Sequence, residues 1–450
     1  MGETMAQIDP RGSFRSHPEV EPAVESVNRH ARAVNDPRDL DALVDRLADA
    51  DCVLLGEASH GTSEYYRWRA QITAKLLRDH GFSFVAVEGD WTSCYELNRY
   101  VKDLPDSHDG AREALEAFDR WPTWMWANWE MAGFFQWLRT HNDGLPEDEQ
   151  AGFYGLDVYG LYESLQAVVD YLEDVDPDAA ANAREAYRCF EPYGEDAQRY
   201  ARSLRLVPES CQEEVVAVLE ELRRNAPEYA GMAGDDAFSA EQNALVARNA
   251  EAYYRAMVDG NEDSWNVRDR HMTRTLNRLL DQHGPNASGI VWAHNTHVGD
   301  ARATDMPRHG RVNVGQLARE QDTIGDVEIV GFGSTVGEVI ASDAWGADMR
   351  TMDVPRAETN SYEDVFRRAD PENALLFSDD VPDGDPLENA RGHRAIGVVY
   401  HPQHESGNYV PTVLPDRYDA VVHIDETTAL HPVELHPERE RVPELYPSGL

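Results

Sequence analysis

The sequence predicts an α/β fold in which a mainly parallel β-sheet is flanked by helices. Three short apolar runs, at residues 52–55, 82–88 and 289–294, have the length and continuous hydrophobicity of strands buried on both faces of such a sheet. Segments with helical spacing of apolar residues separate these runs. The alternation of strand and helix is typical of right-handed βαβ units, and it places the strands side by side.

The helix after the first strand shows the pattern most clearly. Tyr65, Trp68, Ile72 and Leu76 fall on one stripe, and Gly81 can end the helix in a left-handed conformation. We expect further strands at 152–157, 327–332, 395–400 and 420–425, and a further helix at 264–280.

Long acidic helices interrupt this sheet pattern in the middle of the chain. Val215, Val218, Leu219 and Leu222 have clear helical spacing there. We therefore predict five consecutive segments: a polar lead-in (1–38), the first part of an α/β core (39–160), a helical insertion (161–262), the second part of the core (263–345) and a small α+β C-terminal domain (346–450).

The chain is strongly acidic. It has 83 Asp and Glu against 41 Lys and Arg, a formal net charge of −42, and only two lysines, Lys75 and Lys102. The acidic residues are spread along the chain, so they repel one another at low ionic strength and are screened by salt. This composition predicts a protein of a high-salt cytoplasm. It argues against nucleic acid and anionic membranes as partners, because both require a basic patch.

No apolar run suits a signal peptide, and no stretch approaches the ~20 apolar residues of a membrane span. A cytoplasmic location is therefore expected. Cys52, Cys94, Cys189 and Cys211 are scattered without CxxC spacing, so buried free thiols are the default expectation. The sequence does not indicate an oligomeric state.

The first predicted strand ends in a polar motif, Gly56-Glu-Ala-Ser-His-Gly-Thr62. Ligands of open α/β sheets bind outside the carboxyl ends of strands, where Glu57 and His60 would lie. The positive end of the following helix disfavours an imidazolium, so we expect His60 to be neutral and able to accept a proton. Glu57 could orient its ring. A histidine that only caps the helix is the structural alternative.

Two other predicted strands also end in chemically active side chains. Glu88 ends the second strand, and His294 and His297 follow a later one. If the strands are neighbours, these side chains converge on one cleft. The sequence contains no GxSxG elbow for a serine nucleophile, no P-loop and no GxGxxG.

Charged residues also occupy apolar helix faces. Arg69 lies on the stripe of the first helix, where a buried charge needs a partner, although it could extend to the surface as a structural arginine. Arg268 and Asp269 share a face with apolar residues, and we predict that they pair with each other.

Tryptophans are concentrated in one stretch, where residues 121–137 hold five of the ten. Tryptophan is more often a core residue than a ligand contact, and Trp137 is assigned to the core. The density is nevertheless high enough for some of the others to line a pocket for a large apolar ligand.

Together these segments resemble the erythromycin esterase family. The resemblance runs over most of residues 45–430 and rests on Leu55–Thr62, Val87–Asp90, Trp124–Trp126, Trp137–Arg139 with Asn142, Gly155–Asp157 and Ala293–His297. It implies an α/β core, a helical insertion and a smaller C-terminal domain.

In that family the histidine of the GExxHG segment is regarded as the general base that activates water for ester cleavage, a role that falls on His60. The family's accompanying polar residues fall on Glu57, Arg69, Glu88, His294 and His297. With the resemblance in view, the candidates for substrate contact are Trp91, Trp124, Trp126 and Asp157.

The motif and the resemblance together predict a hydrolase for a small-molecule ester or lactone, macrolide antibiotics being one candidate class. Neutral His60, oriented by Glu57, would take a proton from a water that attacks the carbonyl carbon. Arg69, or the two later histidines, would stabilise the oxyanion. Glu88 would position the water or accept its proton. This scheme needs no cofactor.

Three alternatives stay open. A divalent metal could be held by His60, Glu57, Glu88, His294 and His297, which would make the protein a metal-dependent hydrolase. The same core resembles haem- or iron-binding uptake proteins, so the chain could bind metal or haem without catalysis, although a haem site needs mainly an axial ligand and an apolar slot. A role in polysaccharide or secondary-metabolite biosynthesis is the third.

Overall fold

The computed structural model describes residues 19–193, 199–200, 203, 211–259 and 264–433. Contacts group the chain into two units. Within the described residues, the first comprises 19–82, Asn128–Met131 and 290–433, and the second comprises Ser83–Ala127 and 132–289. The chain passes between the units several times, so the units cut across the five consecutive segments predicted from the sequence.

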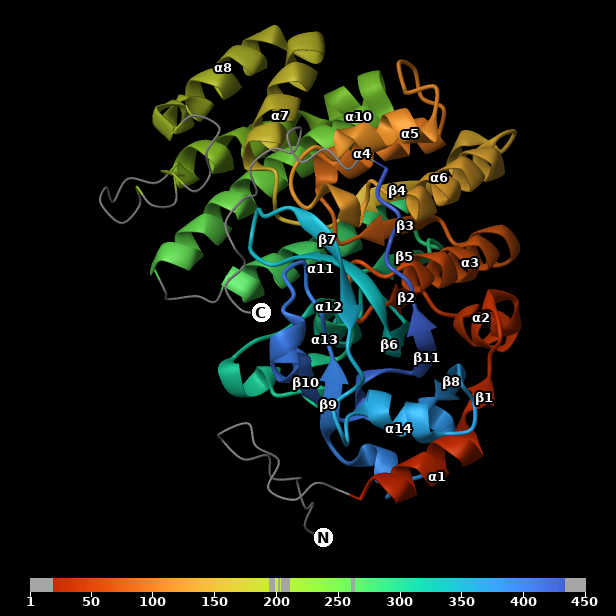
Figure 1. The fold of residues 1–450 in the computed structure, drawn as a ribbon. Helices are drawn as coiled ribbons and strands as arrows, with labels where there is room; N and C mark the ends of the chain where they lie inside the picture. The colour runs from red at the N-terminus through yellow and green to blue at the C-terminus, as the bar shows by residue number, and fades with distance from the viewer. Residues whose placement is uncertain (1–18, 194–198, 201–202, 204–210, 260–263, 434–450) are drawn as a thin grey trace. The chain divides into compact units, whose positions relative to one another are not determined.

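The first unit is built on a β-sheet with helices beside it (Figure 1). Its strands lie in the order β1-β8-β11-β6-β2-β5, and β7 pairs with β6. The strands are β1 (Arg32–Ala33), β2 (Cys52–Leu55), β5 (Gly289–Trp292), β6 (Val327–Ser342), β7 (Met349–Val354), β8 (Ala374–Phe377) and β11 (Ala420–Thr427). A separate two-stranded sheet pairs β9 (Arg391–Arg394) with β10 (Tyr409–Thr412).

The helices of the first unit connect these strands. They are α1 (Val20–His30), α2 (Asp41–Leu47), α3 (Ser63–His80), α12 (Asn295–Val298), α13 (Val314–Glu320), α14 (Tyr362–Arg368) and α15 (Leu414–Arg417). Short 3₁₀ helices lie at η1 (Pro37–Leu40), η6 (Ala301–Ala303), η7 (Met306–His309), η8 (Ser378–Asp380), η9 (Pro386–Glu388) and η10 (Pro402–Asn408).

The centre of this sheet is parallel. β6 runs parallel to β2, with Leu55 opposite Val330, and parallel to β11 on its other side. The antiparallel pairs β1–β8, β8–β11 and β6–β7 lie outside this centre. Every residue of β2 and β5 is buried, as their continuous apolar sequences predict. β6 continues well past the end of β2, and this extension borders the candidate site.

The second unit holds two parallel strands and most of the long helices. Its elements are β3 (Phe84–Val87), β4 (Gly152–Gly155), α4 (Trp91–Val101), α5 (Ala111–Ala114), α6 (Trp129–Asn142), α7 (Leu161–Val175), α8 (Pro177–Tyr187), α10 (Gln212–Asp259), α11 (Ser264–His283), and the 3₁₀ helices η2 (Leu115–Ala117), η3 (Thr123–Met125), η4 (Glu147–Glu149) and η5 (Arg188–Tyr193). The first turn of α6 groups with the first unit. Buried apolar residues of α7, α8 and α10 form one cluster.

The observed elements confirm the α/β class and the mainly parallel sheet. Gly81 ends α3 with a φ of 72°, the left-handed conformation that glycine adopts without strain. Two details differ from the sequence analysis. Residues 20–33 of the predicted lead-in include α1 and β1, and residues 395–400 form no regular strand but contribute isolated bridges at Ile396 and Val399. The remaining lead-in residues before 19 lie outside the described chain.

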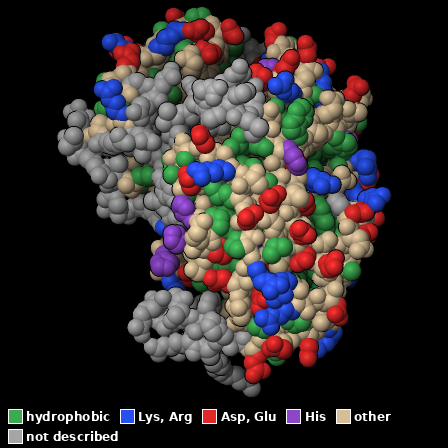
Figure 2. Space-filling view, viewed as in Figure 1, with side chains coloured by type: hydrophobic (Ala, Val, Ile, Leu, Met, Phe, Trp, Pro, Cys, Tyr) green, Lys and Arg blue, Asp and Glu red, His purple; other side chains and the backbone are tan. Residues whose placement is uncertain are grey.

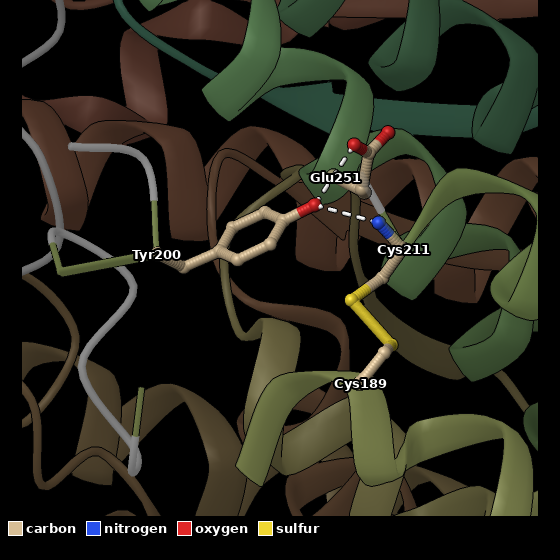
Figure 3. Close-up of a disulfide and its surroundings, with 4 residues drawn as sticks. All are labelled: Cys189, Tyr200, Cys211 and Glu251. Atoms are coloured by element: carbon tan, nitrogen blue, oxygen red, sulfur yellow. Dashed lines mark hydrogen bonds between the residues drawn. A yellow bond between two sulfur atoms is a disulfide. The ribbon is translucent and has the colours of Figure 1, made fainter. Parts of the chain in front are cut away.

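Cys189, in η5, and Cys211, directly before α10, form a disulfide (Figure 3). The expectation of free thiols is therefore corrected for this pair, whereas Cys52 and Cys94 are free and buried. The main-chain amide of Cys211 donates to the Tyr200 hydroxyl, which donates to Glu251. Structural disulfides are rare in reducing cytosol, so the cytoplasmic location stays a prediction.

Reduction of this disulfide is expected to destabilise the protein by about 3 kcal/mol, because the bond closes a loop with a sequence separation of 22 residues. The measurement is urea denaturation with and without dithiothreitol. Cys189→Ser is the control, since its stability should be low and insensitive to the reductant. Equal stability of the oxidised and reduced wild type would contradict the prediction.

Acidic side chains are dispersed over the visible face of the protein, with basic and apolar side chains between them (Figure 2). This agrees with their even spread along the sequence. Among the residues that the structure describes, no helix is long and apolar enough to cross a membrane.

Candidate active site

A seven-residue turn, 56–62, joins the carboxyl end of β2 to α3, and we call it the catalytic turn. β6 positions its start, because the amide of Gly56 donates to the carbonyl of Val330 at 2.8 Å. The amide of Ile340, farther along β6, donates to the carbonyl of Gly61 at 3.0 Å. The turn is thus fixed at both ends by one strand.

Glycine is required at both ends of the catalytic turn. A Cβ atom at Gly56 would lie 2.1 Å from the side-chain oxygen of Asn295, and one at Gly61 would lie 1.9 Å from the carbonyl oxygen of Ile340. Neither contact is sterically possible, so these glycines allow the backbone to approach its neighbours closely.

Glu57, His60 and Arg69 form a buried chain of charge-assisted contacts. One oxygen of the Glu57 carboxylate accepts a hydrogen bond from Nδ1 of His60 at 2.8 Å. The other oxygen accepts one from Nη2 of Arg69 at 2.5 Å. Glu57 is 1% exposed, His60 6% and Arg69 0%. A carboxylate accepts only, so Nδ1 of the imidazole carries a proton, and Nε2 is the nitrogen that can accept a proton in the neutral ring.

Arg69 has the partner that its place on the apolar stripe requires. Besides the ion pair with Glu57, its guanidinium lies over the rings of Tyr66 and Trp292, at 4.7 and 4.9 Å from their centroids. The indole of Trp292 in turn donates to Thr73. These contacts hold the guanidinium in a cation–π sandwich and fix the orientation of Glu57.

His294 lies beside His60. The two ring centroids are 5.0 Å apart. Nδ1 of His294 accepts the main-chain amide of Thr296 at 3.3 Å, at the start of α12. Its proton therefore lies on Nε2, which can donate a hydrogen bond. His297, on the same short helix, is also buried.

Asn295 links the two strand endings, a role that the sequence analysis missed. Its main-chain amide donates to the carbonyl of Glu57 at 2.8 Å. Its side-chain amide donates to the carbonyl of Phe332 on β6 and accepts from the main-chain amide of the same residue. Its position between two candidate histidines was the available signal.

The remaining predicted site residues belong to the second unit. The Glu88 carboxylate accepts Nη2 of Arg268 at 2.8 Å, and Asp157 accepts Nε and Nη2 of the same arginine at 2.9 and 2.6 Å. The predicted partner of Arg268 was Asp269, its neighbour in the sequence, whereas the guanidinium is bound by the carboxylates of Glu88 and Asp157. Burial lowers the pKa of the neighbouring His271 to about 4, so this histidine is neutral.

The tryptophans predicted to contact substrate are buried. The Trp91 indole donates to Ser239, and the Trp126 indole donates to the carbonyl of Glu88. Trp124 is also buried, whereas Trp129 is 55% exposed. Exposure of a single tryptophan within the aromatic stretch could not be read from the sequence.

Within the described part of the chain, no group of three or more His, Cys, Asp and Glu side chains is arranged to hold a metal ion. Metal dependence stays a matter for metal analysis of the purified protein.

The fold and the site define an α/β protein with a histidine–carboxylate pair at the carboxyl edge of a mainly parallel sheet. The erythromycin esterase family model matches residues 77–427, and the chain belongs to this family. The matched range covers Glu88, Asp157, His294 and His297 and begins after the catalytic turn.

Solved structures share the fold. A succinoglycan biosynthesis protein superposes with a TM-score of 0.73 at 21% identity, covering 91% of this chain and 98% of that one. A Bacillus cereus protein gives 0.77 at 18% identity, covering 92% and 100%. A mutant of the erythromycin esterase EreC in its open conformation gives 0.64 at 18% identity, covering 87% and 94%. Likeness at these identities establishes the fold.

Proposed function

We propose that the protein is a hydrolase that cleaves an ester or lactone bond with His60 as the general base. The observation that carries the proposal is the hydrogen bond between Glu57 and Nδ1 of His60, which leaves Nε2 to accept a proton. Burial of the pair keeps competing water away from the Glu57 carboxylate. Family membership supports the same class of reaction.

In the proposed reaction, Nε2 of His60 removes a proton from water as the water oxygen attacks the carbonyl carbon. Glu57 stabilises the imidazolium that forms, and the hydrogen bond from Arg69 holds the Glu57 carboxylate in place. The tetrahedral intermediate then collapses: its bond to the leaving oxygen breaks, and the His60 imidazolium donates its proton from Nε2 to that oxygen, which gives an acid and an alcohol.

His294 is the candidate for oxyanion stabilisation. Its ring is the neighbour of His60, and its protonated Nε2 can donate a hydrogen bond to the developing negative charge. Arg69 was the other sequence candidate, but its contact with Glu57 favours a supporting role. Glu88 and the predicted substrate contacts Trp91, Trp124, Trp126 and Asp157 stay proposals that rest on the resemblance.

The test is a hydrolysis screen of macrolides, simple lactones and aryl esters in molar KCl. His60→Ala is expected to lower kcat at least about 100-fold, the range of a lost general base. His401→Ala, which removes an exposed histidine, should keep full activity. Equal turnover by the wild type and His60→Ala would contradict the proposed role of His60 as the general base.

Two other outcomes would favour the alternatives. Stoichiometric bound metal that is lost in His60→Ala would support a metal-dependent hydrolase. An absorption shift with added hemin, together with no turnover of any substrate, would support a binding protein.

A further inference from the structure

A segment that follows β9 lies along the catalytic turn. The amide of Ile396 donates to the carbonyl of Ala58 at 2.8 Å, and Ile396 forms a parallel bridge with Ser59. These contacts reach the residue directly before His60. Ile396 is buried, and no other backbone hydrogen bond in the described structure is made to the Ala58 carbonyl. The segment therefore contributes to the position of the middle of the turn, together with the hydrogen bond from Asn295 to Glu57.

Arg394 anchors this segment from two residues away. Its Nη1 donates to the carbonyls of Ser334 and Thr335 on β6, both at 2.9 Å, and its Nη2 donates to the carbonyl of Pro355 at 2.9 Å. Its Nε donates to Glu405 at 2.7 Å. The rigid guanidinium fork thus joins the segment to β6, the strand that fixes both ends of the catalytic turn.

β6 is also joined to the helix that follows the turn. The hydroxyl of Tyr65, on α3, donates to the side chain of Ser334 at 2.9 Å. Arg394 therefore contacts the same strand residue that α3 contacts. Through Ser334 and Ile396, it reaches the structure on both sides of His60.

A second buried glutamate–histidine pair fixes the backbone of Arg394. One oxygen of Glu363 accepts Nδ1 of His393 at 2.7 Å and the main-chain amide of Arg394 at 2.8 Å. Burial raises the pKa of Glu363, but the hydrogen bond and charge of His393 and the charge of Arg394 outweigh burial and bring it to about 2. The carboxylate stays ionised at neutral pH.

We infer that Arg394 is a positioning residue for His60: it holds the 394–396 segment against β6, and the Ile396–Ala58 hydrogen bond transmits that position to the catalytic turn. The catalytic consequence rests on the proposed function, whereas the structural coupling does not. A shift of about 1 Å in a catalytic group can cost 100-fold in rate, so a small relaxation of the segment is sufficient for a measurable effect.

Strand β9 supplies a matched control at its other end. Arg391, like Arg394, is 1% exposed. Its guanidinium donates to the carbonyls of Asn360 and Glu19, neither of which belongs to the turn or to the 394–396 segment. Arg391→Gln removes a buried arginine from the same strand without touching the anchors of the 394–396 segment.

The experiment compares kcat, KM and melting temperature for Arg394→Gln, Arg394→Lys and Arg391→Gln. We expect Arg394→Gln to lower kcat about 10- to 100-fold with KM within about twofold, and Arg394→Lys to recover part of kcat through its charge. Arg391→Gln should lower the melting temperature and keep kcat. Unchanged kcat in Arg394→Gln, or an equal loss in Arg391→Gln, overturns the inference. If Arg394→Gln does not fold, Arg394→Lys takes its place with the same criteria.

A second measurement is independent of turnover. The imidazole resonances of His60 in ¹⁵N-histidine-labelled protein are assigned with His60→Ala and compared among the variants. A shift in the Arg394 variants that is absent in Arg391→Gln supports the coupling even if the wild type hydrolyses none of the substrates. Unshifted resonances in the Arg394 variants overturn it, whatever the outcome for the proposed function.

Discussion

Replacing Arg69 by methionine is expected to lower the free energy of unfolding by about 3–5 kcal/mol and to remove hydrolytic activity. The substitution leaves the Glu57 carboxylate, which is 1% exposed, without its cation. It also frees Glu57 from the orientation that keeps the His60 proton on Nδ1. Urea denaturation in molar KCl measures the first effect, and kcat measures the second.

Two further variants separate the charge from the packing. The double variant Glu57→Gln with Arg69→Met removes both charges, so we expect it to recover much of the stability and none of the activity. Arg46→Met breaks ion pairs of an arginine whose side chain is 42% exposed, and it should cost less than about 1 kcal/mol. The prediction fails if Arg69→Met is as stable as Arg46→Met.

Lowering the pH from 7 to 5 is expected to destabilise the protein through three histidines, of which His271 and His423 are buried and His283 is half-buried. Burial lowers the pKa of His271 and His283 to about 4 and that of His423 to about 3, from an ordinary value of 6.5. Below 6.5 the unfolded chain binds a proton at each histidine and the folded chain does not. The stability present above pH 6.5 is therefore lost as the pH falls towards 4, by about 2 kcal/mol for each histidine at pH 5.

The measurement is urea denaturation between pH 7 and 4 in molar KCl, which screens the changing repulsion between acidic residues. His283→Gln is the control, because removal of one titrating group should reduce the loss at pH 5 by about 2 kcal/mol. The pKa of Glu363 is about 2, so its contribution to stability is lost only as the pH falls below the ordinary glutamate value of 4.5. The loss between pH 7 and 5 therefore reports on the histidines and not on Glu363. A stability that is constant from pH 7 to 5 would rule out buried neutral histidines.

The local pattern of the sequence was enough to place the buried central strands and to suggest a candidate base. Continuous apolar runs at β2, β3 and β5 predicted fully buried strands, because only a strand covered on both faces has no polar positions. Parallel strands share one carboxyl edge, and the structure brings His60 and His294, each following a strand, to a ring separation of 5.0 Å. The need of Arg69 for a partner also followed from its place on an apolar stripe.

The identity of partners was decided by tertiary structure. The sequence paired Arg268 with its neighbour Asp269, but consecutive helix residues do not face each other, and the carboxylates of Glu88 and Asp157 hold the guanidinium. The spacing of Cys189 and Cys211 in the sequence did not predict their disulfide. The 5.9 Å between their Cα atoms, which allows the bond, results from the packing of the surrounding helices.

The hydrogen bonds that position the catalytic turn could not be predicted from the sequence either. The residues that bind its backbone, at 295, 330, 340, 396 and 430, are more than 200 positions away along the chain, and no local periodicity relates them to it. A strand pattern fixes burial and direction within a few residues. Contacts between distant segments depend on how the whole sheet assembles, so Arg394 and its anchors emerged only from the folded structure.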